Sequence, residues 1–138
     1  MTNFRVVVAM LVIAGCGKSG ANSPEARLKL RELERRVKSY YVEKAEFPVG
    51  QVALTPAKAC CPDRCAPSAT AFSDLVWTAL DFRVDEPHWY QYSYASDGKT
   101  GFTATAVGDP GCNGSAVTYT LVGKVENGNI TASVTGPS

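Results

Sequence analysis

The sequence has little of what most enzymes and nucleic-acid-binding proteins need. Among 138 residues there is one histidine, and 14 basic side chains are matched by 13 acidic ones. This balance provides no positive field for nucleic acid, so no nucleic-acid partner is predicted. The sequence also lacks a Gly-x-Ser-x-Gly nucleophile motif, a Cys-x-x-Cys pair and an apolar run of about 20 residues. These absences argue against an α/β-hydrolase, a zinc knuckle and a membrane-spanning helix respectively.

What is present begins with the layout of a secretory signal peptide. Arg5 supplies a positive charge, residues 6–14 form an unbroken apolar run, and Ile13-Ala14-Gly15-Cys16 closes the segment. The run is about half as long as a membrane-spanning helix, which indicates a cleaved segment rather than a permanent span. The last four residues match the bacterial lipobox, whose cysteine receives diacylglycerol and becomes the new amino terminus. An ordinary signal peptide or a buried strand is the alternative interpretation.

The chain therefore divides into a lipoprotein signal peptide (1–15), a lipidated tether (16–22) and one globular domain (23–138). Acyl chains on Cys16 would hold the domain on a membrane without any spanning helix, because two or three chains together bind stably. Cleavage would remove Arg5 and no acidic residue, which leaves a formally neutral mature chain. We expect an exported protein, lipid-anchored to the bacterial cell envelope and facing the periplasm or the cell surface.

Export changes how the other four cysteines are interpreted, because oxidising compartments favour disulfides over free thiols. These are Cys60, Cys61, Cys65 and Cys112. A direct bond between the neighbours Cys60 and Cys61 would be strained, which leaves two pairings open. In either one, a short loop is closed near Cys65 and a long loop is closed at Cys112, the latter worth roughly 4 kcal/mol. A four-thiolate zinc site is the alternative, but its usual spacing is absent, and no metal or cofactor is predicted.

Hydrophobic periodicity predicts a helix at the start of the domain. Ser23 can cap this helix, Pro24 suits its first turn, and Glu25 complements the positive end of its dipole. Apolar residues then recur every three or four positions and define one buried face: Ala26, Leu30, Leu33, Val37 and Tyr40 or Tyr41. The opposite face carries charges of both signs and is interpreted as solvated.

The middle of the chain has no sustained period. Residues 47–50 end the helix, because proline and glycine disfavour its continuation. Residues 51–69 are predicted to form a long loop that disulfides stiffen. Residues 73–80 fit one or two helical turns, with Ser73 as a possible cap.

In the last third of the chain the apolar period changes to two, which indicates β-strands. The predicted strands span residues 90–94, 101–107, 117–121 and 130–134. Tyr90, Tyr92 and Tyr94 share one face, and we interpret this row as core, with an aromatic binding face as the alternative. The predicted fold class is α+β, with one N-terminal amphipathic helix packed on an antiparallel sheet of about four strands and with disulfide-stabilised loops.

A series of segments within roughly residues 23–121 follows a recognisable order. They are Glu25 to Leu30 leading to Tyr40-Tyr41 and Phe47-Pro48, then Trp77 to Phe82, Tyr90 to Tyr94, and Phe102 to Asp109. This order resembles that of bacterial type IV pilins and the related pseudopilins of type II secretion systems. The resemblance implies a pilin-like fold, in which the helix packs across the sheet. It also implies that a loop near the carboxyl end, often fixed by a disulfide, contributes to subunit contacts or recognition.

The chain departs from that family at its amino terminus. A pilin begins with a Gly-Phe-Thr-Leu-Ile-Glu type motif and a long apolar helix, whereas this chain has a signal peptide and Cys16. The resemblance therefore implies a pilin-like head on a lipid anchor rather than an ordinary filament subunit. Some pseudopilins bind Ca²⁺ in an acidic loop after the sheet. Residues 108–114 offer only Asp109, Asn113 and carbonyls where Ca²⁺ takes about six to eight oxygens, so no calcium site is predicted.

No catalytic residue is predicted. His88 is interpreted as a surface or packing residue, because no nucleophile accompanies it and the cysteines are expected to be oxidised. The lipobox and the resemblance together imply a non-enzymatic envelope lipoprotein that makes structural or protein contacts in a type IV pilus or a type II secretion-like system. The alternative is a stand-alone lipoprotein that binds a ligand or peptide on the loops around Cys60, Cys65 and Cys112. A small envelope enzyme that uses His88 is a third hypothesis.

Overall fold

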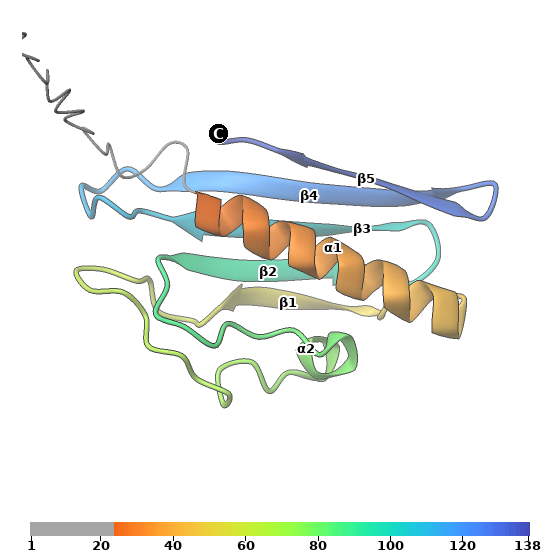
Figure 1. Cartoon of the computed structure of the whole chain (residues 1–138), viewed down its shortest axis with the longest axis horizontal. Coiled ribbons are helices and arrows are strands. Elements are labelled where there is room, and N and C mark those ends of the chain that lie inside the picture. Colours follow the sequence, from red (N-terminus) through yellow and green to blue (C-terminus); the bar gives the residue numbers. More distant parts are fainter. Residues whose placement is uncertain (1–23) are drawn as a thin grey trace, which may run out of the picture.

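The computed structural model describes residues 24–138, which form a five-stranded antiparallel sheet with two helices on one of its faces (Figure 1). The strands lie side by side in the order in which they occur in the chain. The elements are α1 (Pro24–Lys44), β1 (Gly50–Thr55), α2 (Leu75–Leu80), β2 (Tyr90–Ser96), β3 (Gly101–Gly108), β4 (Val117–Glu126) and β5 (Asn129–Thr135). The predicted signal peptide, the tether and Cys16 lie outside the described residues.

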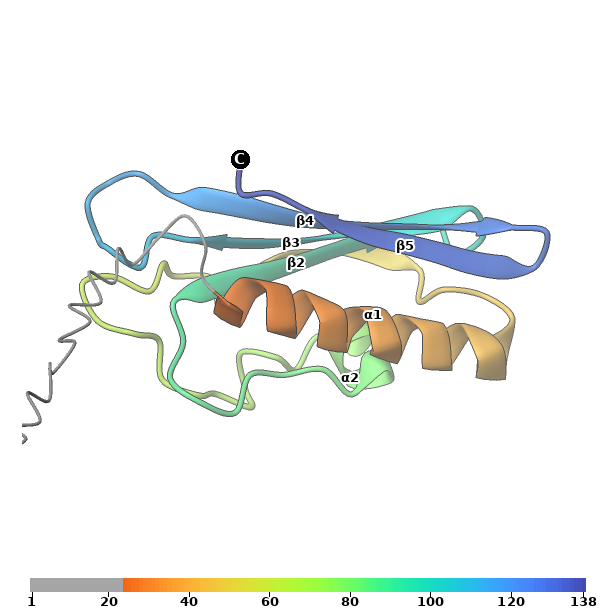
Figure 2. The ribbon, with the colours of Figure 1, turned by 45° about the horizontal axis from the view of Figure 1, so that its top comes forward.

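The fold class predicted from the sequence is wrong. A pilin-like helix on a sheet of about four strands does not describe this chain, because five strands dominate the domain and a second helix, α2, lies on the same side as α1 (Figure 2). The missed strand, β1, lies where a loop was expected. Its buried residues, Val52 and Thr55, are three positions apart because the register with β2 shifts between them. The alternation that marks a strand is therefore missing from this part of the sequence.

The apolar face of α1 forms one side of the core. Its fully buried hydrophobic residues are Ala26, Leu30, Leu33 and Val37. The helix packs with this face against β3, β4 and β5, as the periodicity predicts for an amphipathic helix. Many of its charged residues pair with one another along the helix, for example Lys29 with Glu32 at 2.7 Å. Because local pairs of this kind contribute only about 0.2–0.5 kcal/mol each, the apolar face is what holds α1 in place.

The sheet side of the core is aromatic. Tyr90, Tyr92 and Tyr94 of β2 are at most 1% exposed, which confirms that the tyrosine row is core and not a binding face. The Tyr94 hydroxyl donates a hydrogen bond to the Pro48 carbonyl at 2.9 Å, so this ring is buried with its polar end satisfied. The row therefore joins the sheet to the segment that follows α1.

α2 attaches to the edge strand β1 through Trp77. The indole is fully buried, and its Nε1 donates to the Thr55 hydroxyl at 3.0 Å. Asp74 caps the helix, because its carboxylate accepts the Val76 N–H at 2.9 Å. The sequence had indicated Ser73, one residue earlier. The cap and the indole together fix the orientation of α2 against the sheet.

The turn between β4 and β5 has the conformation that its sequence predicts. Asn127 and Gly128 have φ angles of 52° and 78°, which place both residues in the left-handed region. A two-residue hairpin turn of type I′ requires this conformation, and Asn-Gly adopts it most readily. The turn leaves Glu126 and Asn129 paired, so the register of the last hairpin is set here.

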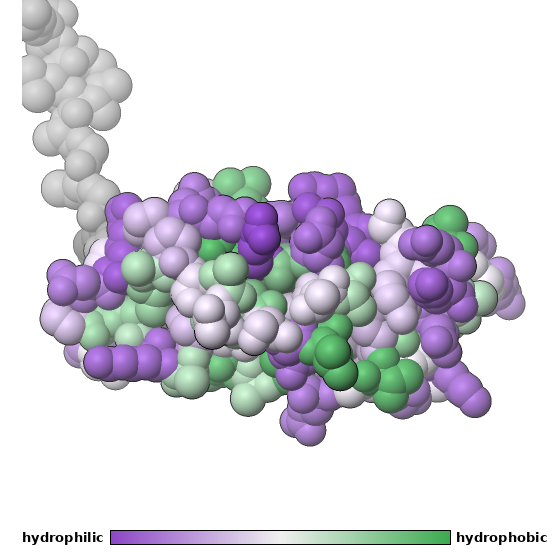
Figure 3. All heavy atoms as spheres, turned by 90° about the horizontal axis from the view of Figure 1, so that it is seen from below, coloured by the Kyte–Doolittle hydropathy of each residue, from purple (hydrophilic) through white to green (hydrophobic). Residues whose placement is uncertain are grey.

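The surface on the side of β1 and α2 mixes hydrophilic and hydrophobic residues, with the strongly hydrophobic ones in small groups (Figure 3). Two large apolar side chains of α1, Leu28 and Val42, are 68% and 86% exposed. Within residues 24–138, no helix combines the length and the apolar character needed to cross a membrane.

The hydrogen bond between Trp77 and Thr55 gives a test of the missed strand. In a Thr55→Val variant the shape of the side chain is kept, but the buried indole N–H loses its acceptor. We expect the free energy of unfolding to fall by about 1–3 kcal/mol, measured by chemical denaturation. The matched control is Thr103→Val on the exposed side of β3, which should change it by less than about 0.5 kcal/mol. Equal effects of the two substitutions would contradict the assigned role of Thr55.

Candidate functional site

Four segments that are distant in the sequence meet at one end of the sheet (Figure 1). They are the first turn of α1, the loop after β1, the segment before β2, and the loop between β3 and β4. A disulfide, a backbone bridge and a carboxylate contact connect them. We call this region the cross-linked end, and it contains every cysteine among the described residues.

Two disulfides hold the cross-linked end together. Cys60 is bonded to Cys65, and Cys61 is bonded to Cys112, with Cα–Cα distances of 4.8 Å and 5.7 Å. This selects one of the two pairings that the sequence left open. All four sulfur atoms are used, so the alternative of a four-thiolate zinc site does not apply to this form of the protein. The second disulfide joins cysteines that are 51 positions apart in the sequence, and the first joins cysteines that are 5 positions apart.

The loop that carries Cys112 is organised by Asp109. Its carboxylate accepts the backbone N–H groups of Asn113 at 3.3 Å and of Gly114 at 2.8 Å. Both carboxylate oxygens therefore hold the turn itself. Residues 108–114 stand where the resemblance to pseudopilins would place a calcium loop. They form a turn stiffened by Asp109 and by the Cys61–Cys112 disulfide.

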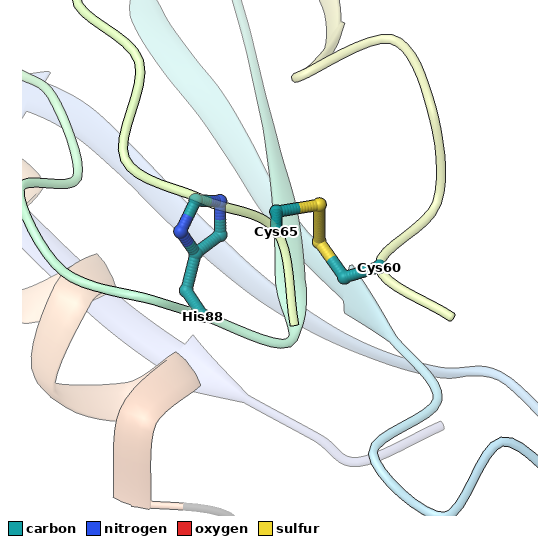
Figure 4. Close-up of side chains that lie close together, drawn as sticks. All are labelled: Cys60, Cys65 and His88. Atoms are coloured by element: carbon teal, nitrogen blue, oxygen red, sulfur yellow. A yellow bond between two sulfur atoms is a disulfide. The ribbon is translucent and has the colours of Figure 1, made fainter. Parts of the chain in front are cut away.

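His88 lies against the other disulfide. Its side chain is 1% exposed, and its backbone forms a two-way bridge with Cys65, with N···O distances of 2.8 Å and 3.1 Å. Figure 4 shows the imidazole ring beside the Cys60–Cys65 bond. The two sulfur atoms and a ring nitrogen all lie within 4.8 Å of one another. His88 is thus a packing residue, but one packed against a pair of cysteines.

One hydrogen bond holds the orientation of the His88 ring. Nδ1 lies 2.9 Å from the Glu86 carbonyl oxygen, which only accepts, so Nδ1 carries a proton and donates it to this contact. Nε2, the other ring nitrogen, is buried with no hydrogen-bond partner among the described residues. A buried polar atom left unpaired costs about 1–3 kcal/mol. The cost makes this nitrogen a candidate for a function that the oxidised chain does not display.

A groove opens next to this cluster, between the start of α1 and the segment before β2. Its volume is about 520 Å³, and its walls include Glu25, Leu28, Arg64 and Trp89. The Arg64 guanidinium lies 5.6 Å from the centre of the Trp89 ring, in the range of a cation–π contact. Arg64 belongs to the loop closed by Cys60 and Cys65, so that disulfide also positions one wall of the groove.

Glu25 connects the helix to the groove wall. Both of its carboxylate oxygens lie 3.1 Å from the Trp89 backbone N–H. Partial burial raises the pKa of the Glu25 carboxyl above its ordinary value, and this effect outweighs the hydrogen bond from Trp89 and the attraction of Arg64, which both lower it. The sequence indicated Glu25 only as a helix-start residue, because its contact with Trp89 spans 64 positions and leaves no local signal.

Comparison with known proteins identifies no family for this site. No family model matches the sequence, and neither a curated protein nor a solved structure matches it. The resemblance to pilins gains no support from these comparisons.

Because the pKa of Glu25 is raised in the folded protein, we predict how the free energy of unfolding depends on pH. The unfolded carboxyl titrates near 4.5, and the folded one titrates at a higher pH. Between these two values the folded state binds more protons than the unfolded state, so its free energy of unfolding falls as the pH rises. A Glu25→Gln variant should lack this decline, measured by denaturation from about pH 4 to pH 7. The control is Glu43→Gln, an exposed position of α1, which should keep it. Parallel pH profiles for Glu25→Gln and the unchanged protein would contradict the assignment.

Proposed function

We propose that this chain is a lipid-anchored protein of the bacterial cell envelope whose domain binds a peptide segment of another envelope protein and catalyses no reaction. The groove at the cross-linked end is the observation that carries the proposal. The lipobox at Cys16 supports export and anchoring. The two disulfides support residence in an oxidising compartment.

The lining of the groove suits a peptide. Leu28 is an apolar side chain that is 68% exposed, and the Trp89 ring lies in the facing wall. Around them stand acidic residues, such as Glu32 and Glu86, and basic residues, such as Arg64. Apolar contacts framed by charges of both signs match a segment with one apolar side chain and a polar backbone. Aromatic residues and arginine are the side chains that most often dominate binding at such interfaces.

The position of the groove suits a partner close to the membrane. Glu25, in its wall, stands nine residues after Cys16 in the sequence. A fully extended chain of this length reaches at most roughly 30 Å. A lipid on Cys16 would therefore keep the groove near the bilayer surface. The expected link to a type IV pilus or a type II secretion-like system came from the resemblance, and the corrected fold removes the reason to prefer it over other envelope partners.

The domain catalyses no reaction in this proposal, because its candidate catalytic groups are either buried or bonded to one another. His88 is 1% exposed, which removes it from the reach of a substrate in the groove. The cysteines around it are bonded to one another and offer no thiolate nucleophile. A binding function needs neither group.

The anchoring step is tested by intact mass spectrometry of the mature protein. We expect cleavage before Cys16 and an added mass of diacylglycerol, with both lost in Cys16→Ser. Treatment with a reductant should add four hydrogen atoms, two for each disulfide. Recovery of the full-length chain from the cytosol, with its leader intact and its cysteines reduced, would overturn the proposed location.

The binding step is tested with a photo-cross-linking residue at position 28 in intact cells. We expect one defined adduct with an envelope protein, and none from position 42, which is an exposed position on the same helix. A synthetic peptide of the cross-linked segment should then bind about tenfold or more weakly to Leu28→Lys, because the ammonium would have to be desolvated against an apolar side chain. Val42→Lys should bind as the unchanged protein does. Equal adducts from both positions, or equal affinities of the two variants, would contradict a peptide site at the groove.

A further inference from the structure

The strongest unexplained feature of the cross-linked end is the Nε2 atom of His88. It is buried without a hydrogen-bond partner among the described residues, and its ring cannot turn freely. Nδ1 is held at 2.9 Å from the Glu86 carbonyl, and the backbone is held by the two-way bridge with Cys65. A histidine whose other nitrogen donates to a carbonyl oxygen is the arrangement that orients metal-binding imidazoles.

The surroundings of this nitrogen supply the remaining ligands. The Sγ atoms of Cys60 and Cys65 and one ring nitrogen of His88 all lie within 4.8 Å of one another. Because Nδ1 is taken by the Glu86 carbonyl, Nε2 is the nitrogen left to act as a ligand. Zn²⁺ binds cysteine sulfur at about 2.3 Å and histidine nitrogen at about 2.0–2.1 Å, which places tetrahedral ligand atoms about 3.5–3.8 Å apart. Opening the disulfide lets the two sulfur atoms move from bonding distance to this separation. Cys60 and Cys65 are only 5 positions apart in the sequence, so the movement is local.

The second disulfide keeps the loop in place during this change. Cys61, the immediate neighbour of Cys60, is bonded to Cys112 in the β3–β4 loop. The backbone bridge between Cys65 and His88 also does not depend on the sulfur atoms. When Cys60 and Cys65 are reduced, both thiols therefore stay next to the imidazole.

We propose that Cys60, Cys65 and Nε2 of His88 form a redox-gated site for a thiophilic metal ion of the Zn²⁺ type. A dithiol reductant supplies two electrons and two protons, becomes a disulfide itself, and leaves two thiols in place of the Cys60–Cys65 bond. Zn²⁺ then binds both sulfur atoms and Nε2, and the two thiol protons pass to solvent. Water takes the fourth position on the side of Cys65, which is the partly exposed member of the pair. The oxidised protein has no thiolate and does not bind the ion.

The test uses the full mature protein in detergent, treated with a water-soluble phosphine. The phosphine takes oxygen from water as it reduces a disulfide, and it competes weakly for metal. Alkylation and mass spectrometry identify the conditions in which Cys60 and Cys65 are free while Cys61 and Cys112 stay bonded. Co²⁺ is then added without oxygen, as an optical probe, and Zn²⁺ is titrated against it. We expect one equivalent to bind, with sulfur-to-cobalt charge transfer and tetrahedral bands that Zn²⁺ abolishes, and no binding to the oxidised protein.

The variant that decides the matter is His88→Asn. Its amide can still donate to the Glu86 carbonyl, but it has no atom at the position of Nε2. We expect its Zn²⁺ affinity to fall by about 100-fold or more, since one of three protein ligands is lost. If this variant does not fold, the ¹⁵N resonance of Nε2 in the unchanged protein gives the same answer, because Zn²⁺ should shift it. Unchanged affinity in the variant, an unshifted resonance, or binding only when all four cysteines are reduced would overturn the proposal.

Discussion

The structure depends on the burial of one face of α1 against a wall of aromatic side chains. Leu30 and Leu33 are fully buried there, and each such side chain contributes about 1.5–3 kcal/mol, several times the worth of an ion pair along the helix. Arg27 adds a directional contact, because its guanidinium donates to the Gly136 carbonyl at 2.6 Å and lies 5.1 Å from the centre of the Tyr119 ring. Apolar burial thus supplies the stability, and the polar contacts at the first turn fix where the helix begins on the sheet.

The cross-linked end is built on a different principle. The loop after β1 has few apolar residues to bury, and its residues 57–59 and 62–64 are exposed. Two disulfides and the bridge between Cys65 and His88 stabilise the backbone there, as burial of apolar side chains does in the core. Because these cross-links constrain the backbone at few points, side chains between them stay available to a partner. Arg64 is such a side chain, held at the groove by the cysteines that enclose it in the sequence.

The sequence was informative for several elements whose determinants are local. The apolar period of α1, the alternation in β2 and β3, and the Asn127-Gly128 turn each depend on neighbouring residues, and the structure confirms each of them. The predicted fold class was wrong because the shift of register in β1 removes the alternation that marks a strand, and because the resemblance to pilins implied a smaller sheet. The groove and the surroundings of His88 were missed for a related reason. Glu25 and Trp89, or Cys65 and His88, come together only through the path of the whole chain, which no spacing rule encodes.

Because Cys60 and Cys61 are adjacent, oxidative folding of this chain must select between two similar disulfide pairings. The two pairings that avoid a direct bond between them close loops that differ by one residue each, so chain entropy separates them by only about 0.2 kcal/mol. The unfolded chain therefore has almost no preference for one disulfide pairing over the other. Selection must come from structure that already exists when the bonds form, above all from the bridge that places Cys65 beside His88 and turns Cys60 toward it. The native disulfides therefore depend on a sheet that has already assembled. An isomerase acting on the exported chain would have to exchange Cys60 with Cys61, two cysteines one position apart.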